Sequence, residues 1–461
     1  MLGKRLPTPS ARAKRVRTPQ VGRNGSTVTG SMLLVAIVAV SILLMLLRPR
    51  GIAEVWWVSA GAGALVALHL IPLSLAAHAV REGLDVYLFL IGMMLLSGLA
   101  EREGVFDWVA ARAVSGASRN GSLSGVRLFT LIYLAGIAVT VLLSNDATVV
   151  VLTPAVLTAV RRARVSPLPY LYACAMIANA ASFALPISNP ANLVVFRGRM
   201  PTLGHWMVAF GLAAVLAIAA TYAVLRWHFR CELNDCQPSW SATASRAASS
   251  LPPDGRLSAN GRLVLLGLAG MIAALLVASE RGIDLGWPTC GLAVAVTAIL
   301  SLKQRRSPID LLLHISWKTI GLVAALFILV DAMVSVGALR VAVAALSHAQ
   351  TLRAGALLVS FAIGLGNNLV NNLPLGLIVG SAAQAAHLRT LMSAAVMMGI
   401  DLGSNLSVTG SLATILWLIA LRREGLQVSA RQYLRVGIWV MPAGMLAALA
   451  GLFTMHLLGA L

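Results

Sequence analysis

The most regular pattern in this sequence is a long apolar run that is broken at its centre by polar residues. Residues 126–160 are apolar on both sides of Ser144-Asn145-Asp146, and residues 353–386 are apolar on both sides of Asn371-Asn372. Two apolar arms around a polar tip predict a re-entrant hairpin, which enters the membrane and returns. Such a tip must be buried in protein or line a cavity, because lipid cannot pair its backbone groups.

A second kind of break follows each hairpin by about 40 residues. Residues 168–196 are interrupted by the stretch from Pro186 to Pro190, which contains Asn189, and residues 391–421 are interrupted between Asp401 and Ser411. Proline at the first position of a helix, with Asn or Ser before it, is typical of a helix N-terminus. We therefore expect one broken helix in each half of the chain.

Uninterrupted apolar segments complete the pattern. They are predicted at residues 31–47, 52–72, 86–100, 205–225, 263–279, 288–302, 315–339 and 436–458. With help from flanking residues, each is long enough to cross about 30 Å of hydrocarbon. Residues 101–127 are expected to form a loop. The predicted fold is an all-α polytopic membrane protein with about 10–12 transmembrane helices, two re-entrant hairpins and two broken helices.

The predicted elements follow the same order in both halves of the chain. Each half has three helices, a hairpin, a broken helix and a final helix, which makes five crossings because a hairpin adds none. An odd number of crossings inverts one repeat relative to the other. We predict a first membrane repeat at residues 31–225, a cytoplasmic linker at residues 226–262 and a second membrane repeat at residues 263–461.

The composition agrees with a membrane protein. Of 461 residues, 58% are hydrophobic and 11% are charged, whereas soluble domains contain about 25% charged residues. The 36 Lys and Arg residues stand mostly between apolar segments. They are topology signals rather than a surface for nucleic acid, and their excess on the side of the linker predicts that this side is cytoplasmic. The expected location is the inner (plasma) membrane, with multiple crossings.

The N-terminal tail differs from the rest of the chain. Residues 1–30 are basic, and their first 28 residues carry seven Lys or Arg, no acid and no apolar periodicity. We expect this tail to be disordered. Met32 opens the first apolar run and is an alternative start of translation.

The four breaks supply the candidate substrate-binding residues. A helix that begins inside the membrane presents unpaired backbone N–H groups and a partial positive charge, which suit oxygen-rich or anionic ligands. The predicted substrate-binding residues stand at these helix starts: Asn145, Asn189, Asn371, Asn372 and Ser411. The alternative is that they only end ordinary helices at the membrane surface.

Two acids stand far from any predicted loop. Asp146 and Asp401 are costly inside a membrane, so each is predicted to carry a coupling proton; helix capping is the alternative. Asp331 is a third candidate, with a polar contact between helices as its alternative role. Four scattered cysteines and the lack of metal-binding or nucleotide-binding motifs predict no metal and no cofactor.

Three motifs resemble the ArsB-type arsenite efflux permeases of the ion transporter superfamily. They are residues 143–147 with 152–154, residues 371–374 and residues 399–417. The last is the most specific, and the similarity covers about residues 32–460. The resemblance implies a transporter rather than an enzyme. It implies export of arsenite or antimonite across the lipid bilayer, with proton exchange or an associated cytoplasmic ATPase subunit as the energy source.

The sequence departs from that family at two breaks. Ala147 stands where the family usually has Gly, and residues 407–410 lack the usual proline. The substrate therefore stays open within the superfamily, which also holds sodium/proton antiporters and anion carriers. A distant alternative is an intramembrane aspartyl hydrolase that uses Asp146 and Asp401 as its dyad, although the Gly-x-Gly-Asp context is missing.

Overall fold

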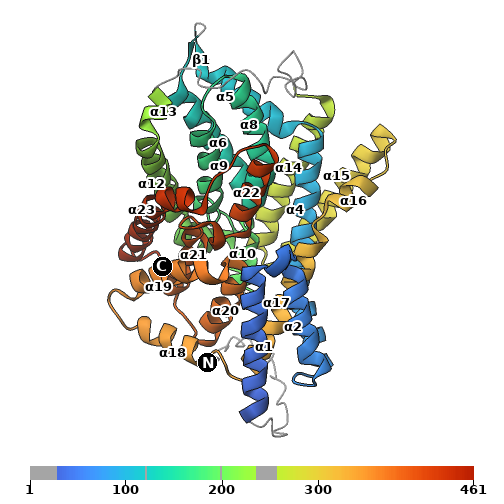
Figure 1. Ribbon diagram of the computed structural model, residues 1–461, viewed down its shortest axis with the longest axis vertical. Helices are drawn as coiled ribbons and strands as arrows, with labels where there is room; N and C mark the ends of the chain where they lie inside the picture. Colours follow the sequence, from blue (N-terminus) through green and yellow to red (C-terminus); the bar gives the residue numbers. More distant parts are fainter. Residues whose placement is uncertain (1–27, 120–121, 198–199, 235–256) are drawn as a thin grey trace, which may run out of the picture.

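The part of the protein that the structure describes is almost entirely helical. A computed structural model describes residues 28–119, 122–197, 200–234 and 257–461 (Figure 1). Within these ranges, eight helices are long and apolar enough to cross a membrane. They are α1 (Val28–Leu47), α4 (Leu84–Arg102), α6 (Gly125–Leu142), the span Leu203–His228, α14 (Ala259–Glu280), α15 (Gly286–Gln304), α17 (Trp317–Ser335) and α23 (Ala430–Leu457). The expected all-α polytopic membrane fold is confirmed.

The predicted hairpins appear as two helices on either side of a polar tip. The first consists of α6 and a second arm of α7 (Asn145–Ala147), the π-helix η2 (Thr148–Leu152) and α8 (Thr153–Arg162). The second consists of α19 (Gly355–Val370) and α20 (Asn372–Ala385). Figure 1 shows α6 and α8 in the upper half of the molecule and α19 and α20 in the lower half. The inversion of the two repeats predicts this placement, but the inversion itself stays a prediction.

Both broken helices are interrupted where the sequence predicts. α9 (Leu168–Ala180) is followed by the 3-10 turn η3 (Pro186–Ser188) and α10 (Pro190–Val195). α21 (Thr390–Gly403) is followed by η6 (Val408–Gly410) and α22 (Leu412–Arg423). Each second arm starts at a capping side chain, because the Asn189 Oδ1 atom accepts from the N–H of Ala191 at 3.0 Å and Ser411 Oγ from that of Ala413 at 3.2 Å.

The prediction of a loop at residues 101–127 is wrong. This stretch contains α5 (Val105–Ala117) and a two-residue hairpin of β1 (Ser118–Arg119) and β2 (Ser122–Leu123). α5 buries Phe106, Ala110 and Ala113 at helical spacing and keeps a polar face. An amphipathic helix has no continuous apolar run, so a search for membrane-spanning segments passes over it. The same reason explains why α3 (Leu73–Glu82) was not predicted.

The helices form two groups that lie beside each other. The outer bundle contains α1, α2 (Glu54–Ala67), α3, α4, α14, α15 and α17; the broken-helix bundle contains the hairpins, the broken helices, α12 (Leu212–His228) and α23. Each bundle mixes both halves, since α4 packs on α15, α2 on α17 and α12 on α23. Figure 1 shows the outer bundle on the right and the broken-helix bundle on the left.

Glycines allow close packing inside the broken-helix bundle. A Cβ atom on Gly399 of α21 would lie 2.8 Å from the carbonyl oxygen of Ser360 on α19, and Gly364 faces Gly403 across the same interface. Small residues let two backbones approach closely, which is the usual basis of helix association in membranes. The broken helix and the hairpin of the second half are thereby held together.

The predicted linker begins with helical structure. α12 continues to His228, and α13 covers Arg230–Asn234. Residues 235–256 lie outside the described residues, as do residues 1–27 of the predicted tail. The domain boundaries therefore stay predictions.

Candidate functional site

A cavity of about 390 Å³ lies between the two bundles. This is a usual size for a small-molecule site. Its polar wall consists of Glu54, Ser97, Glu101, Ser144, Asp146, Ser316, Lys318 and Thr319. A smaller cavity of about 40 Å³ shares Glu54, Leu322 and Leu412 with it and extends to Asn371 and Thr409. The two cavities therefore adjoin.

The four helix starts meet around these cavities. The larger cavity touches Asp146 at the start of α7, Pro190 at the start of α10 and Leu412 at the start of α22. The smaller cavity touches Pro374, in the first turn of α20. Helix starts from both halves of the chain thus lie in one region.

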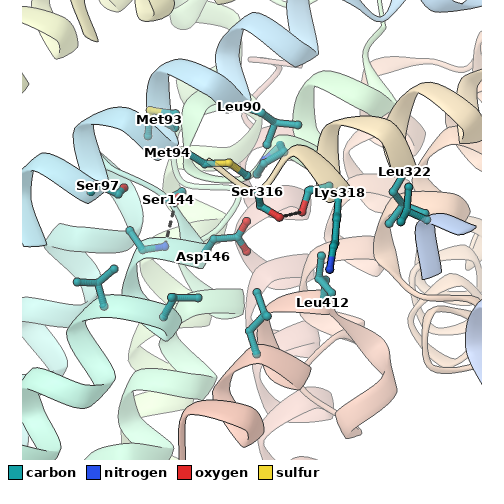
Figure 2. Close-up of a pocket in the computed structure, with 18 of the residues that line it drawn as sticks. Leu90, Met93, Met94, Ser97, Ser144, Asp146, Ser316, Lys318, Leu322 and Leu412 are labelled. Carbon is teal, nitrogen blue, oxygen red and sulfur yellow. Dashed lines mark hydrogen bonds between the residues drawn. The ribbon is translucent and has the colours of Figure 1, made fainter. Parts of the chain in front are cut away.

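The first hairpin tip presents Asp146 to the larger cavity. Ser144 Oγ accepts a hydrogen bond from the Ala147 N–H at 3.2 Å, and Asn145 Oδ1 accepts from the Asp146 N–H at 2.9 Å. Ser144 and Asn145 are buried, and these two hydrogen bonds of their side chains fix the turn. Figure 2 shows the Asp146 carboxylate directed toward the wall formed by Ser316 and Lys318.

The second hairpin tip is strained. Asn371 has φ 77° and ψ 153°, a backbone conformation that glycine adopts easily and other residues rarely do. Its Nδ2 atom donates to the carbonyl of Thr409 at 3.3 Å. Asn368, one turn earlier, holds the same loop, because its Oδ1 atom accepts from the Ser407 N–H at 3.0 Å and from the Ser407 hydroxyl at 2.7 Å. The tip is thereby fastened to the break in the second broken helix.

Asp401 lies outside the cavity wall. Its side chain is 1% exposed, and its Oδ1 atom accepts from Asn189 Nδ2 at 2.8 Å. Ser182 lies close to it, and the Ser182 hydroxyl donates to the carbonyl of Asn179 at 2.7 Å. Asp401 Oδ2 makes no hydrogen bond within the described part of the chain. Asn189 therefore caps the broken helix of the first half and binds the acid of the second half.

The predicted site residues divide into two sets. Asp146 and Asn371 line the cavities. The residues that lie buried behind the walls are Asn145, Asn189, Asn372, Ser411 and Asp401. Asn372 is 3% exposed, and its Oδ1 atom has no hydrogen-bond partner among the described residues.

Asp331 is placed away from both cavities. It pairs with Arg197 of the first broken helix, so its alternative role as a polar contact between helices is the one observed.

One buried amide pair was missed by the sequence analysis. Asn179 Nδ2 donates to Asn405 Oδ1 at 3.0 Å, and Asn405 Nδ2 donates to the carbonyl of Met176 at 3.1 Å. The two asparagines are 226 positions apart, the same offset that separates Asn145 from Asn371. Applying that offset to every asparagine within the apolar segments would have found the pair.

Several charged residues of the wall were also missed. Glu54 and Lys318 stand at helix starts and Glu101 at a helix end, where the sequence interprets charge as a topology signal. Arg48 lines the smaller cavity and forms an ion pair with Glu54. These helix ends line the same cavity only because α2, α4 and α17 pack together, and the sequence does not show that packing.

Comparison with known proteins places the chain in a family. A sequence model of the citrate transporter family matches residues 27–403. The chain belongs to this family. The chain is also similar to curated proteins. It is 26% identical over 424 residues to an arsenical pump membrane protein of Escherichia coli, and the alignment covers 87% of this chain and 94% of that protein. It is 27% identical over 426 residues to the arsenical pump membrane protein of Yersinia enterocolitica, with the same coverage.

A solved structure shares the fold of this citrate transporter family member. The YdaH transporter of Alcanivorax borkumensis, described as having an unusual topology, superimposes with a TM-score of 0.57 at 13% identity, covering 93% of this chain and 98% of that chain. The resemblance to ArsB-type permeases is confirmed by the curated relatives. The protein is a multi-pass membrane transporter of the cell's inner membrane, as expected.

Proposed function

We propose that this transporter exports arsenite or antimonite, as neutral trihydroxides, in exchange for protons. The observation that carries the proposal is the charge on the cavity wall. The larger cavity presents three acids, Glu54, Glu101 and Asp146, whereas the cations at the two cavities are Lys318 and Arg48, which pairs with Glu54. A tricarboxylate would meet an excess of like charge there, whereas a neutral trihydroxide needs only hydrogen-bond partners. The names of the arsenical pump relatives support the same substrate.

Proton exchange supplies the energy in this proposal. A neutral substrate draws no energy from the membrane potential, whereas an exchanged proton draws about 2.3 kcal/mol per charge for each 100 mV. Asp146 on the wall exchanges protons with the cavity, and Asp401 carries a proton where it is sealed from water. An associated ATPase subunit is the alternative energy source. An uncoupler should stop export in the first case, and ATP depletion with the proton gradient maintained should stop it in the second.

We further propose that the five predicted binding residues act in two ways. Asn371 contacts substrate directly from the smaller cavity. Asn145, Asn189 and Ser411 hold the helix starts whose N–H groups face the cavity, and their side chains already bond to backbone N–H groups at these starts. Asn372 retains an unpaired oxygen that can turn to the substrate when the tip moves. Direct binding by Asn371 predicts that Asn371→Ala loses much more substrate affinity than thermal stability, since the lost bond to Thr409 is long and exposed.

The deciding experiment is expression in a bacterium that lacks arsenic efflux. Growth on arsenite and cell-associated arsenic are measured for the wild type and for Asp146→Asn. Asp284→Asn serves as a matched control, because Asp284 is exposed and away from both cavities. We expect resistance from the wild type and the control only. Arsenite sensitivity that stays unchanged by a membrane-inserted wild-type protein contradicts the proposal.

A second candidate function is an anion or sodium carrier of the same superfamily. Two observations favour a carboxylate as the substrate. The family is that of citrate transporters, and two cations, Lys318 and Arg48, line the cavities. Arg48 is already neutralised by Glu54, which weakens this candidate. Citrate uptake into vesicles, and sodium or lithium tolerance of the same cells, would identify these functions.

The membrane arrangement is also proposed. We propose that residues 31–225 and 263–461 form two inverted repeats and that the excess of Lys and Arg on the side of the linker keeps it in the cytoplasm. The cavity then opens inward, because Glu101, Ser316 and Lys318 of its wall stand at helix ends on that side. Ser239→Cys in the linker should resist a membrane-impermeant thiol reagent in intact cells. Labelling of this cysteine from outside intact cells would contradict the proposed orientation.

A further inference from the structure

An arginine cluster joins the two bundles at a distance from the cavity. Arg197 donates from Nη1 to Asp331 Oδ1 at 2.8 Å and from Nη2 to Asp331 Oδ2 at 3.1 Å, and it also pairs with Glu82. Its guanidinium carbon lies 4.5 Å from the ring centroid of Phe327. A two-pronged arginine–carboxylate pair on an aromatic face is geometrically specific and strong for its kind.

The partners of Arg197 come from opposite sides of the bundle interface. Arg197 follows α10 in the broken-helix bundle, whereas Glu82 ends α3 and Asp331 lies on α17 in the outer bundle. The carbonyl of Arg197 accepts from Gln384 Nε2 of α20 at 3.0 Å. The cluster therefore fastens an arm of the first broken helix, and through it an arm of the second hairpin, to the outer bundle.

The cluster lies at the end of the interface that faces away from the cavity. Ser316, the N-cap of α17, and Leu322 within α17 line the cavity. Asp331 stands nine residues beyond Leu322, which is about 13.5 Å along a helix. Ser316, Lys318 and Glu101 at the cavity end are exposed. The side chains of Arg197 and Asp331 are only 13% and 14% exposed. The interface is thus open at one end and closed at the other.

Two ion pairs near the open end each lie within a single bundle. Arg48 pairs with Glu54 within the outer bundle, and Arg161 pairs with Glu424 within the broken-helix bundle. Separating the bundles at the open end breaks neither pair. Separating them at the closed end must break the pairs of Arg197.

We propose that Arg197, Glu82 and Asp331 form a latch that holds the closed face of the transporter shut while the cavity is open on the opposite side. The latch must release before the cavity can open to the other side of the membrane. Its loss shifts the population toward the conformation that opens at the closed face, because only the closed conformation contains the three contacts. The proposal does not depend on which substrate is carried.

The test is thiol labelling of the cavity from the two sides of the membrane. Ser97→Cys is introduced in a background without the four native cysteines, and a membrane-impermeant reagent is applied to intact cells and to inverted vesicles. The ratio of the two labelling rates reports which face is open. The latch variants Arg197→Gln, Asp331→Asn and Glu82→Gln are compared with Arg340→Gln, an exposed arginine nine residues after Asp331 that takes no part in the latch.

We expect Arg197→Gln and Asp331→Asn to raise labelling from the closed face severalfold and to lower labelling from the open face. The charge exchange Arg197→Asp with Asp331→Arg should return the ratio toward that of the wild type, and Arg340→Gln should leave it unchanged. If Arg197→Gln does not fold, Glu82→Gln at the exposed edge of the latch tests the same ratio with a milder change. A ratio that stays at the wild-type value in the inserted Asp331→Asn and Glu82→Gln proteins overturns the latch, since a merely structural contact would lower stability without changing sidedness.

Discussion

Asp146 and Asp401 are the same residue type at comparable breaks, yet their surroundings are opposite. Asp146 stands on the wall of the larger cavity and is directed into it. Asp401 is 1% exposed and is bound by the amide of Asn189. The two positions therefore differ in access: Asp146 lines the cavity in this conformation, whereas Asp401 is buried against Asn189. Under the proposed proton exchange, this difference predicts that Asp146 exchanges its proton with the cavity before Asp401 does.

Removing the Asp401 carboxyl should have the largest effect, because it changes folding as well as transport. Asp401→Ala leaves the Asn189 amide buried without this partner, which costs about 1–3 kcal/mol. Asp401→Asn keeps an oxygen for that amide, so we expect near-normal thermal stability, intact substrate binding and no export against a gradient. Unfolding in detergent and uptake into inverted vesicles measure these quantities. Equal stability of the two variants would show that the Asn189 contact is dispensable.

Substituting Asp146 should separate transport from stability. Asp146→Asn removes a charge that faces the cavity, so we expect an unchanged unfolding temperature and loss of uphill export. The same vesicle assay with an imposed pH gradient provides the measurement. Export against the gradient by both Asp146→Asn and Asp401→Asn would assign the two acids to helix capping and would remove the distinction between them.

The second hairpin tip offers a smaller and more selective change. Glycine relieves the strain of the Asn371 backbone, which costs about 1–3 kcal/mol for a non-glycine residue, whereas alanine retains it. Asn371→Gly should therefore be more stable than Asn371→Ala, while both lose the amide. If the amide binds substrate, both variants bind weakly in equilibrium binding to vesicles. If Asn371→Gly binds normally, the position serves only the shape of the tip.

The ion pair of Arg161 and Glu424 should matter least. Their side chains are 25% and 45% exposed, and a surface pair contributes about 0–1 kcal/mol. Arg161→Gln should leave export unchanged and lower the free energy of unfolding by less than about 1 kcal/mol. A large loss of export in this variant would mean that the contact between the ends of α8 and α22 also controls transport.

Apolar runs, with their polar interruptions, determined the class of this protein and the positions of its breaks. The signal is strong there because a membrane requires continuous apolar surface, and each interruption needs capping groups such as Asn189 and Ser411 that the sequence displays. α3 and α5 were not predicted, because an amphipathic helix at the edge of a membrane protein has no such continuous apolar surface.

The functions of the individual polar residues were decided by tertiary structure. Nothing local distinguishes an acid that faces a cavity from one that is sealed, so Asp146 and Asp401 received the same prediction. Three features join segments that are far apart in the chain. They are the bond between Asn179 and Asn405, the acidic wall formed by Glu54 and Glu101, and the contact of Arg197 with Asp331. Such contacts exist only where the packing of the two halves brings helix ends together. The sequence could not predict them, because hydrophobic patterning shows which face of a helix is buried but not which helix covers that face.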